Sequence, residues 1–218
     1  DPIDQDFRDH TAYSGTAIGE YALSPSIALF VAGTLNKRDY REREGPVPAR
    51  DSTGFELAGG ASFELGRKAR GSLRLGYLHQ DYRAAAFKDV SGLLVRGELA
   101  YFLTPLVTIT GTVDRGIRET GVNGATGYLA TNMTLRADYE LLRNLIISVG
   151  GELEKRGFND IDRRDDRWTW RAGASYLLSK RMALRFDLQR RSQSSEGVTA
   201  GRSFADNRIS VGVTFSGL

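Results

Sequence analysis

The chain contains no cysteine, which excludes a disulfide scaffold and catalysis by a thiol, and which suits a protein that crosses an oxidising compartment. No stretch approaches the roughly 20 apolar residues that a membrane helix needs. Neither sign of charge dominates, because 30 basic residues accompany 27 acidic ones, so nucleic-acid binding is not indicated. The first residues, DPIDQDF, are not a basic segment followed by an apolar one, so we expect a removed signal peptide or an internal start.

With 25 glycines and only 5 prolines, the composition favours extended structure with many turns, and a strict alternation of side chains supports this. In TGFELAGGASFEL (53–65), Phe55, Leu57 and Phe63 share one parity, whereas Glu56 and Glu64 share the other. Successive side chains of a strand point to opposite faces, so this segment has one apolar and one polar face. A helix would distribute the glutamates around its circumference. The pattern therefore predicts a strand.

The segment DYELLRNLIIS (138–148) fits either an amphipathic helix or two strands joined by a tight turn. Leu135, Ala137 and Tyr139 alternate with polar residues before Leu142-Arg143-Asn144, and the alternation resumes after it. We therefore predict a hairpin. The same test predicts eleven strands, at about 11–23, 26–40, 53–66, 71–83, 91–103, 106–117, 128–141, 145–158, 166–178, 182–192 and 206–216.

Aromatic residues recur near the short connections between these strands, at intervals of 37 to 42 residues. They are Tyr21, Phe63, Tyr101, Tyr139, Tyr176 and Phe215. Such a period indicates a repeated hairpin unit, and a ring of aromatic side chains at one level is typical of a membrane interface. We interpret the six as a girdle on the periplasmic side.

A soluble β-sandwich also alternates, with its apolar face inward. Two features favour a membrane barrel instead. The predicted strands exceed the usual soluble length of about 5–6 residues. Short connections also alternate strictly with long polar ones, as in outer-membrane barrels, whose turns are short on the periplasmic side. The fold class predicted is an all-β, transmembrane, antiparallel up-and-down β-barrel.

Residues 1–218 are predicted to form a single β-barrel domain. If the short turns are periplasmic, the first strand starts outside and the eleventh ends in the periplasm. Single-chain bacterial barrels have an even number of strands with both ends inside. We therefore expect the chain to be a C-terminal portion that lacks N-terminal strands; an irregular N-terminal segment or several chains completing one barrel are the alternatives.

Several segments resemble the family of Gram-negative outer-membrane proteins called putative β-barrel porin 2. They are GYLHQDY (76–82), TPLVTITGTVDRGIRET (104–120), LRADYELLRNLIIS (135–148) and DRRDDRWTWRAGASYLLSKRMALRFDLQRRSQS (162–194), together with Asn207. The resemblance implies an outer-membrane barrel associated with polysaccharide export, in which some members form the channel for the polymer. We expect outer-membrane lipid and lipopolysaccharide as partners, and a periplasmic polysaccharide-export protein is a further candidate that the sequence does not decide.

The polar parity of the strands carries charges of both signs. The candidate lumen-lining residues are Glu56, Glu64, Arg74, Arg96, Glu98, Asp114, Arg136, Asp138, Glu152, Glu154, Arg171, Arg185 and Asp187. They could line a wet lumen that sorts solutes, or pair across strands and fill the interior as struts. Side chains fill an eight-stranded barrel, whereas 16–18 strands leave an aqueous channel, so eleven or more strands favour the channel. The mixed signs predict weak charge selectivity.

Other chemistry has weaker support. NDIDRRDD (159–166) has four aspartates but lacks the glycine and final glutamate of an EF-hand loop, so we predict a solvated loop and no metal. RERE (41–44) and GRSFADN (201–207) are predicted to be polar loop tips. The two histidines, His10 and His79, have no partnered nucleophile in the sequence, so no catalytic residue and no cofactor are predicted.

We therefore predict a passive, porin-like channel in the outer membrane of a Gram-negative bacterium, a conduit for exopolysaccharide or another polar solute. Two alternatives stay open. A structural or adhesive barrel would have a closed, salt-bridged interior. A lipid-modifying enzyme would need a serine or an acid close to His79.

Overall fold

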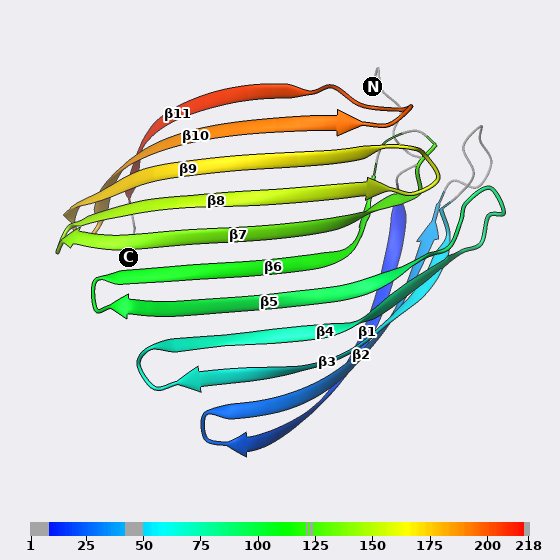
Figure 1. Ribbon diagram of the computed structural model, residues 1–218, viewed down its shortest axis with the longest axis horizontal. Coiled ribbons are helices and arrows are strands. Elements are labelled where there is room, and N and C mark those ends of the chain that lie inside the picture. The colour runs from blue at the N-terminus through cyan, green and yellow to red at the C-terminus, as the bar shows by residue number, and fades with distance from the viewer. Residues whose placement is uncertain (1–8, 42–49, 121, 123, 216–218) are drawn as a thin grey trace.

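The computed structural model describes residues 9–41, 50–120, 122 and 124–215, and its regular elements are all antiparallel strands (Figure 1). The strands are β1 (His10–Ser24), β2 (Ile27–Tyr40), β3 (Ser52–Leu65), β4 (Ala69–Tyr82), β5 (Val90–Thr104), β6 (Val107–Glu119), β7 (Gly127–Leu142), β8 (Leu145–Phe158), β9 (Arg164–Ser179), β10 (Met182–Glu196) and β11 (Phe204–Phe215). They form one sheet in sequence order, with β1 and β11 at its edges. The predicted up-and-down fold class is confirmed. No helix in the described residues is long and apolar enough to cross a membrane.

The hairpin predicted in DYELLRNLIIS is confirmed, because β7 ends at Leu142 and β8 begins at Leu145. The largest difference from the predicted bounds lies in β10, which continues four residues beyond 192, to Glu196. The segment RSQSSE (191–196) has polar residues on both faces, so no alternation marks it as a strand. It is nevertheless held by pairing with the first residues of β9.

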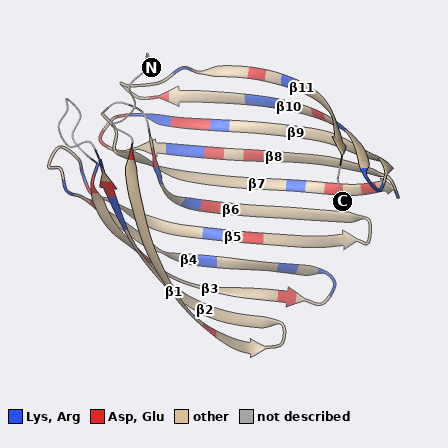
Figure 2. Ribbon diagram, turned by 180° about the vertical axis from the view of Figure 1, so that it is seen from behind, with Lys and Arg blue, Asp and Glu red and all other residues tan. Residues whose placement is uncertain are grey.

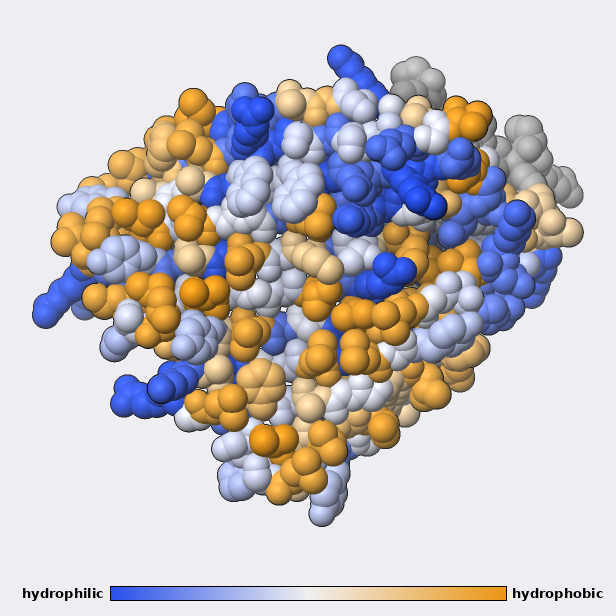
Figure 3. All heavy atoms as spheres, viewed as in Figure 1, coloured by the Kyte–Doolittle hydropathy of each residue, from blue (hydrophilic) through white to orange (hydrophobic). Residues whose placement is uncertain are grey.

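The sheet has one apolar and one polar face, and it is the apolar face that lies open. Leu35, Leu57 and Leu135 are 70%, 64% and 62% exposed, respectively. Figure 3 shows this convex face, where hydrophobic residues gather over the middle and left and hydrophilic ones are most frequent toward the loops at the upper right. A soluble sandwich would bury these side chains, so the arrangement is that of a wall whose outer face meets lipid. Figure 2 shows the opposite, concave face from behind.

The apolar stripe on the convex face has the length of a membrane crossing. In β3 it runs from Phe55 to Leu65 and in β9 from Trp168 to Leu178, about the 9–11 residues that a tilted strand needs. Toward the long loops the same parity becomes polar, for example at Lys155. The six predicted girdle aromatics also have this parity, as their register shows, and lie near the short-turn ends of their strands. Their role at the interface stays a prediction.

At the loop end, β6 leaves its neighbour and closes part of the concave side. Pairing between β5 and β6 ends at Val95 and Arg115, whereas β6 stays paired with β7 as far as Glu119. Beyond the split, Ile117 packs against a cluster of Ala58, Leu78 and Leu94. Figure 1 shows β1 and β2 passing behind the sheet toward this end. The space enclosed by the concave face is therefore narrower at the long loops than at the short turns.

Candidate functional site

The register places all thirteen candidate lumen-lining residues on the concave face. Pairing of Glu56 with Leu78, of Arg74 with Arg96 and of Arg96 with Asp114 fixes that face on β3 to β6. The same parity continues through Arg136, Glu152, Arg171 and Arg185 to β10. The strands thus bring the thirteen together as one surface, and their role as a lumen lining stays a prediction.

In the middle of the concave face, a network crosses β3, β5 and β6. Arg96 Nη2 lies 3.2 Å from Glu56 Oε2, and Arg96 Nε lies 3.5 Å from Asp114 Oδ2. Asp114 also pairs with Arg118, four residues further along β6. Arg74 lies directly opposite Arg96 in the register, but its guanidinium turns away and lies 5.2 Å from the centre of the Phe30 ring. This separates the two like charges.

A second network occupies the loop-end half of β8 to β10. Arg156 donates two hydrogen bonds of 2.7 Å to the two carboxylate oxygens of Glu154. Arg167 donates to Glu154 at 3.1 Å and to Gln193 Oε1 at 2.7 Å. Bidentate arginine–carboxylate contacts fix both partners in geometry. These side chains act as struts between strands.

Nearer the loop, Asp165 is buried, with 2% of its surface exposed. Its two carboxylate oxygens accept hydrogen bonds from Arg163 at 3.0 and 2.7 Å, and one also accepts from the Ser195 hydroxyl at 2.5 Å. The hydrogen bond to this carboxylate raises the pKa of the Arg163 guanidinium above its ordinary value. The negative charge of the buried Asp165 is therefore balanced by the guanidinium of Arg163.

The long loop between β8 and β9 ties the neighbouring loops together. Asp160 accepts from the Lys88 amide at 3.0 Å and from the Thr126 hydroxyl at 2.5 Å. Asp162 Oδ2 accepts from the Val198 amide at 3.1 Å. The segment is therefore a connector between loops rather than the freely solvated loop that the sequence indicated. No group of three or more histidine or acidic side chains that could hold a metal occurs in the part of the chain that the structure describes.

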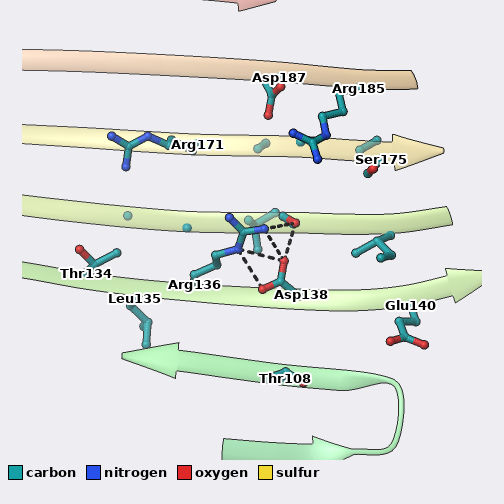
Figure 4. Close-up of a pocket in the computed structure, with 18 of the residues that line it drawn as sticks. Thr108, Thr134, Leu135, Arg136, Asp138, Glu140, Arg171, Ser175, Arg185 and Asp187 are labelled. Atoms are coloured by element: carbon teal, nitrogen blue, oxygen red, sulfur yellow. Dashed lines mark hydrogen bonds and ion pairs between the residues drawn. The ribbon is translucent and has the colours of Figure 1, made fainter. Parts of the chain in front are cut away.

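The short-turn half of the concave face is hollow. A cavity of about 650 Å³ lies over β6 to β10 (Figure 4). On one side of it Arg136 donates to both oxygens of Asp138, at 2.9 Å each through Nε. Glu140, Arg185 and Asp187 also line the cavity, and within the described residues none of the three has an ion pair. Figure 4 shows Arg136, Asp138, Arg185 and Asp187 projecting from the same face of their strands.

A second hollow, of about 790 Å³, lies at the same end over β1 to β6. Hydroxyl groups line it, from Ser26, Ser62, Ser72, Thr110 and Thr112 among others. Its charged residues are Glu64, Arg70 and Glu98, and no ion pair joins them to any described residue. Both hollows are therefore open, and their linings mix polar and apolar groups.

Aromatic rings on the concave face are functional candidates that sequence reasoning missed. Each has an arginine guanidinium within 6 Å of its ring centre, and the pairs are Phe30 with Arg74, Phe102 with Arg70, Tyr128 with Arg156, Phe158 with Arg163, and Phe204 with Arg191. The signal that could have found them is an aromatic residue on the otherwise polar parity. In IALFVA (27–32) both parities are apolar, so Phe30 was hidden.

A lipid-modifying enzyme would need a serine or an acid close to His79. His79 Nε2 lies 2.9 Å from Asp81 Oδ1, and Ser91 is opposite His79 in the register. No hydrogen bond joins Ser91 to His79 among the described residues, and His79 Nδ1 is buried without a partner there. An acid therefore lies close to His79, whereas a serine hydrogen-bonded to it, as nucleophilic catalysis would need, is not formed among the described residues.

An open apolar face, a charged concave face and alternating short and long connections define the wall of an outer-membrane β-barrel. The family model described as "Putative beta-barrel porin 2" matches residues 1–216, and the chain belongs to this family of porins. The resemblance found in the sequence is thereby confirmed. Among curated proteins, none matches the chain.

One solved structure shares the fold over most of the chain. The outer membrane channel DcaP of Acinetobacter baumannii has a TM-score of 0.55 and 11% identity, over 92% of this chain and 61% of that channel. This chain therefore spans less than two thirds of that channel's length. The ferric-catecholate import receptor Fiu of E. coli K12 is less similar, with a TM-score of 0.49 and 9% identity over 93% of this chain and 48% of the receptor.

Proposed function

We propose that the chain lines the hydrated lumen of a passive channel in the outer membrane of a Gram-negative bacterium, and that polar solutes cross through it without cofactor or turnover. The observation that carries this is the short-turn half of the concave face. There, two hollows are lined by hydroxyl groups and by charged side chains, and five of the latter, Glu64, Glu98, Glu140, Arg185 and Asp187, have no ion pair within the described residues. Side chains that filled the interior would instead be paired and packed.

The solute class that best suits this surface is a neutral or weakly charged polysaccharide. Sugar hydroxyl groups exchange hydrogen bonds with serine, threonine and carboxylate side chains, which the hollow over β1 to β6 supplies. Aromatic rings on the concave face add apolar surfaces of the size of a sugar ring. Because acidic and basic residues are interspersed, a strongly charged polymer of either sign meets opposing side chains along the way.

The family resemblance supports the same solute and suggests its partner. For polysaccharide export, a periplasmic export protein would deliver the polymer at the short turns. Arg67, Lys68, Arg143, Lys180 and Arg181 lie in or beside these turns and are exposed. An acidic docking surface on the partner would match them.

A closed barrel, held by salt bridges, is the rival function. The networks around Arg96 and Glu154 favour it for the middle and the loop-end half, because they link strands across the concave face. A structural barrel of this kind would carry no ionic current. A measurement of ionic current therefore distinguishes the two functions.

The test is single-channel conductance of the full-length protein in planar bilayers. Large, stable openings with weak ion selectivity are expected, and added polysaccharide of graded length should block the current in steps. Folding is verified by the shift in gel mobility on heating. Silence from correctly folded protein would contradict the channel and support the closed barrel.

A further inference from the structure

A hollow of about 910 Å³ lies on the convex face, across β6 to β11. Its walls are almost wholly hydrocarbon, with Leu135, Trp170 and Ile209 among the lining side chains. These three are 62%, 58% and 70% exposed, so the described chain leaves the hollow uncovered. On a lipid-facing wall, such a depression is a place where acyl chains can order.

Two tryptophans form a ledge in the hollow. The rings of Trp168 and Trp170 are nearly parallel, with an interplanar angle of 11° and centres 6.1 Å apart. Trp170 lies across β8 at Gly151, where a Cβ atom would come within 2.9 Å of its ring. Because Gly151 has no side chain, the ring of Trp170 can lie against the backbone of β8. Tryptophan is favoured where hydrocarbon meets polar groups, so the ledge marks the outer boundary of the apolar stripe.

Basic side chains lie along the loop side of this ledge. Arg190 lines the hollow and is opposite Trp170 in the register, and Lys155 lies on the next strand but one. Both are exposed, and neither has an ion pair within the described residues. Asp166 is opposite Lys155 but forms no ion pair with it. Arg115, on the same face of β6, donates to the Thr131 hydroxyl at 2.8 Å.

The other side of the sheet differs. At the equivalent boundary on β2, Lys37 is paired with Asp39 at 2.7 Å, and on β4 His79 contacts Asp81 at 2.9 Å. The basic side chains at these two positions therefore each have an acidic partner on the same strand. On the β6 to β10 side the outward-facing Arg190 and Lys155 differ, because neither has an acidic partner within contact distance among the described residues. Both also lie beside the apolar hollow.

We propose that this hollow binds a phosphorylated lipid with several acyl chains in the outer leaflet. Its chains occupy the apolar depression beside Trp168 and Trp170, and its phosphates meet Arg190 and Lys155. Charge complementarity selects this occupant over a second copy of the chain, which would bring its own cations to the same place. The inference rests on the part of the proposed function that inserts the convex face in the outer membrane. It does not depend on conduction.

Trp168 and Trp170 are the only tryptophans of the chain, so their emission reports on the hollow. The folded chain in zwitterionic detergent micelles is titrated with bisphosphorylated lipid A, with the fully dephosphorylated lipid A and with phosphatidylglycerol. We expect a saturable change in emission with bisphosphorylated lipid A, and weaker binding of the other two. Arg190→Gln and Lys155→Gln should each weaken binding about fivefold, the equivalent of one lost phosphate contact. Arg143→Gln, which removes an exposed cation at the opposite short turns, should leave it unchanged.

Equal binding of the dephosphorylated lipid, or unchanged affinity in both variants, would overturn the proposal. So would an emission change that appears on raising protein concentration without lipid, because the hollow would then be covered by a second copy. Channel activity lost while phosphate-dependent binding persists would refute only the conducting lumen. Binding lost in a protein that still conducts would refute only the lipid site.

Discussion

The two halves of the concave face use the same residue types for different purposes. Toward the long loops, acidic and basic side chains are paired across strands, as Asp165 is with Arg163 and Glu154 with Arg156 and Arg167. Toward the short turns Arg136 pairs with Asp138, but Glu64, Glu98, Glu140, Arg185 and Asp187 have no ion pair within the described residues. Most of the buried residues also lie in the loop half.

An alternating charged strand therefore does not by itself indicate a filled or an open interior. Where strands converge, as β6 does toward β1 and β2, side chains come within reach and pair. Where they diverge, the same side chains keep their hydration, since an exposed ion pair contributes little. The loop half is therefore braced by ion pairs, and the short-turn half is the more open part of the concave face.

The largest effect should come from removing the buried aspartate of the loop half. Asp165→Ala leaves Arg163 without its partner and Ser195 without its acceptor, and should lower the free energy of unfolding by about 3 kcal/mol. The matched control is Asp187→Ala, an inward aspartate of the short-turn half, which should change it by less than about 0.5 kcal/mol. Urea unfolding in lipid vesicles measures both. Equal losses would erase the distinction between the halves.

A smaller effect is expected at the contact that draws β6 toward β2. Glu119 lies 3.2 Å from Arg38 Nε and 3.6 Å from His10 Nε2, and both pairs are partly exposed. Glu119→Ala should lower the free energy of unfolding by about 1–2 kcal/mol.

Because the same contact narrows the loop end, Glu119→Ala should also increase single-channel conductance. Glu140→Ala, at the short-turn end, serves as its control and should leave the unfolding free energy nearly unchanged. A conductance that stays the same in Glu119→Ala would show that the loop end is not the narrow part of the lumen.

The smallest effect on stability, but a clear one on selectivity, is expected for the unpaired charges. Arg185→Gln should shift the reversal potential in a salt gradient toward cation preference, and Asp187→Asn toward anion preference, because each removes one fixed charge from the lining. Both should unfold like the unaltered protein. Arg190→Gln, on the same strand but facing outward, should not move the reversal potential. Shifts of the same sign in the two lumen variants would argue against a direct electrostatic role.

The strands and their faces could be predicted from the sequence, because alternation is local. That Arg96 and Asp114 share a face follows from parity within each strand and from the order of hairpins. The partners could not be predicted. Arg96 lies opposite Arg74 but reaches Glu56 across β4, a choice that depends on side-chain conformation and on the open space beside it.

The closure of the loop end was also beyond sequence reasoning. It depends on Glu119 meeting Arg38 from a distant strand, and no local pattern in NKRDY (36–40) or GIRET (116–120) signals that contact. The loop DIDRRDD was interpreted as solvated for the same reason. Its aspartates are polar whether they face water or the amides of other loops.

The connector loop between β8 and β9 has a consequence for motion. Asp160 has a left-handed backbone, with φ of 66°, and it holds the loops before β5 and before β7, while Asp162 holds the loop before β11. Releasing one of these loops removes partners from the others. The amide hydrogens of Lys88, Val198 and Thr199 should therefore exchange with deuterium at a common rate, as one cooperative unit, so that the outer mouth opens all at once or not at all.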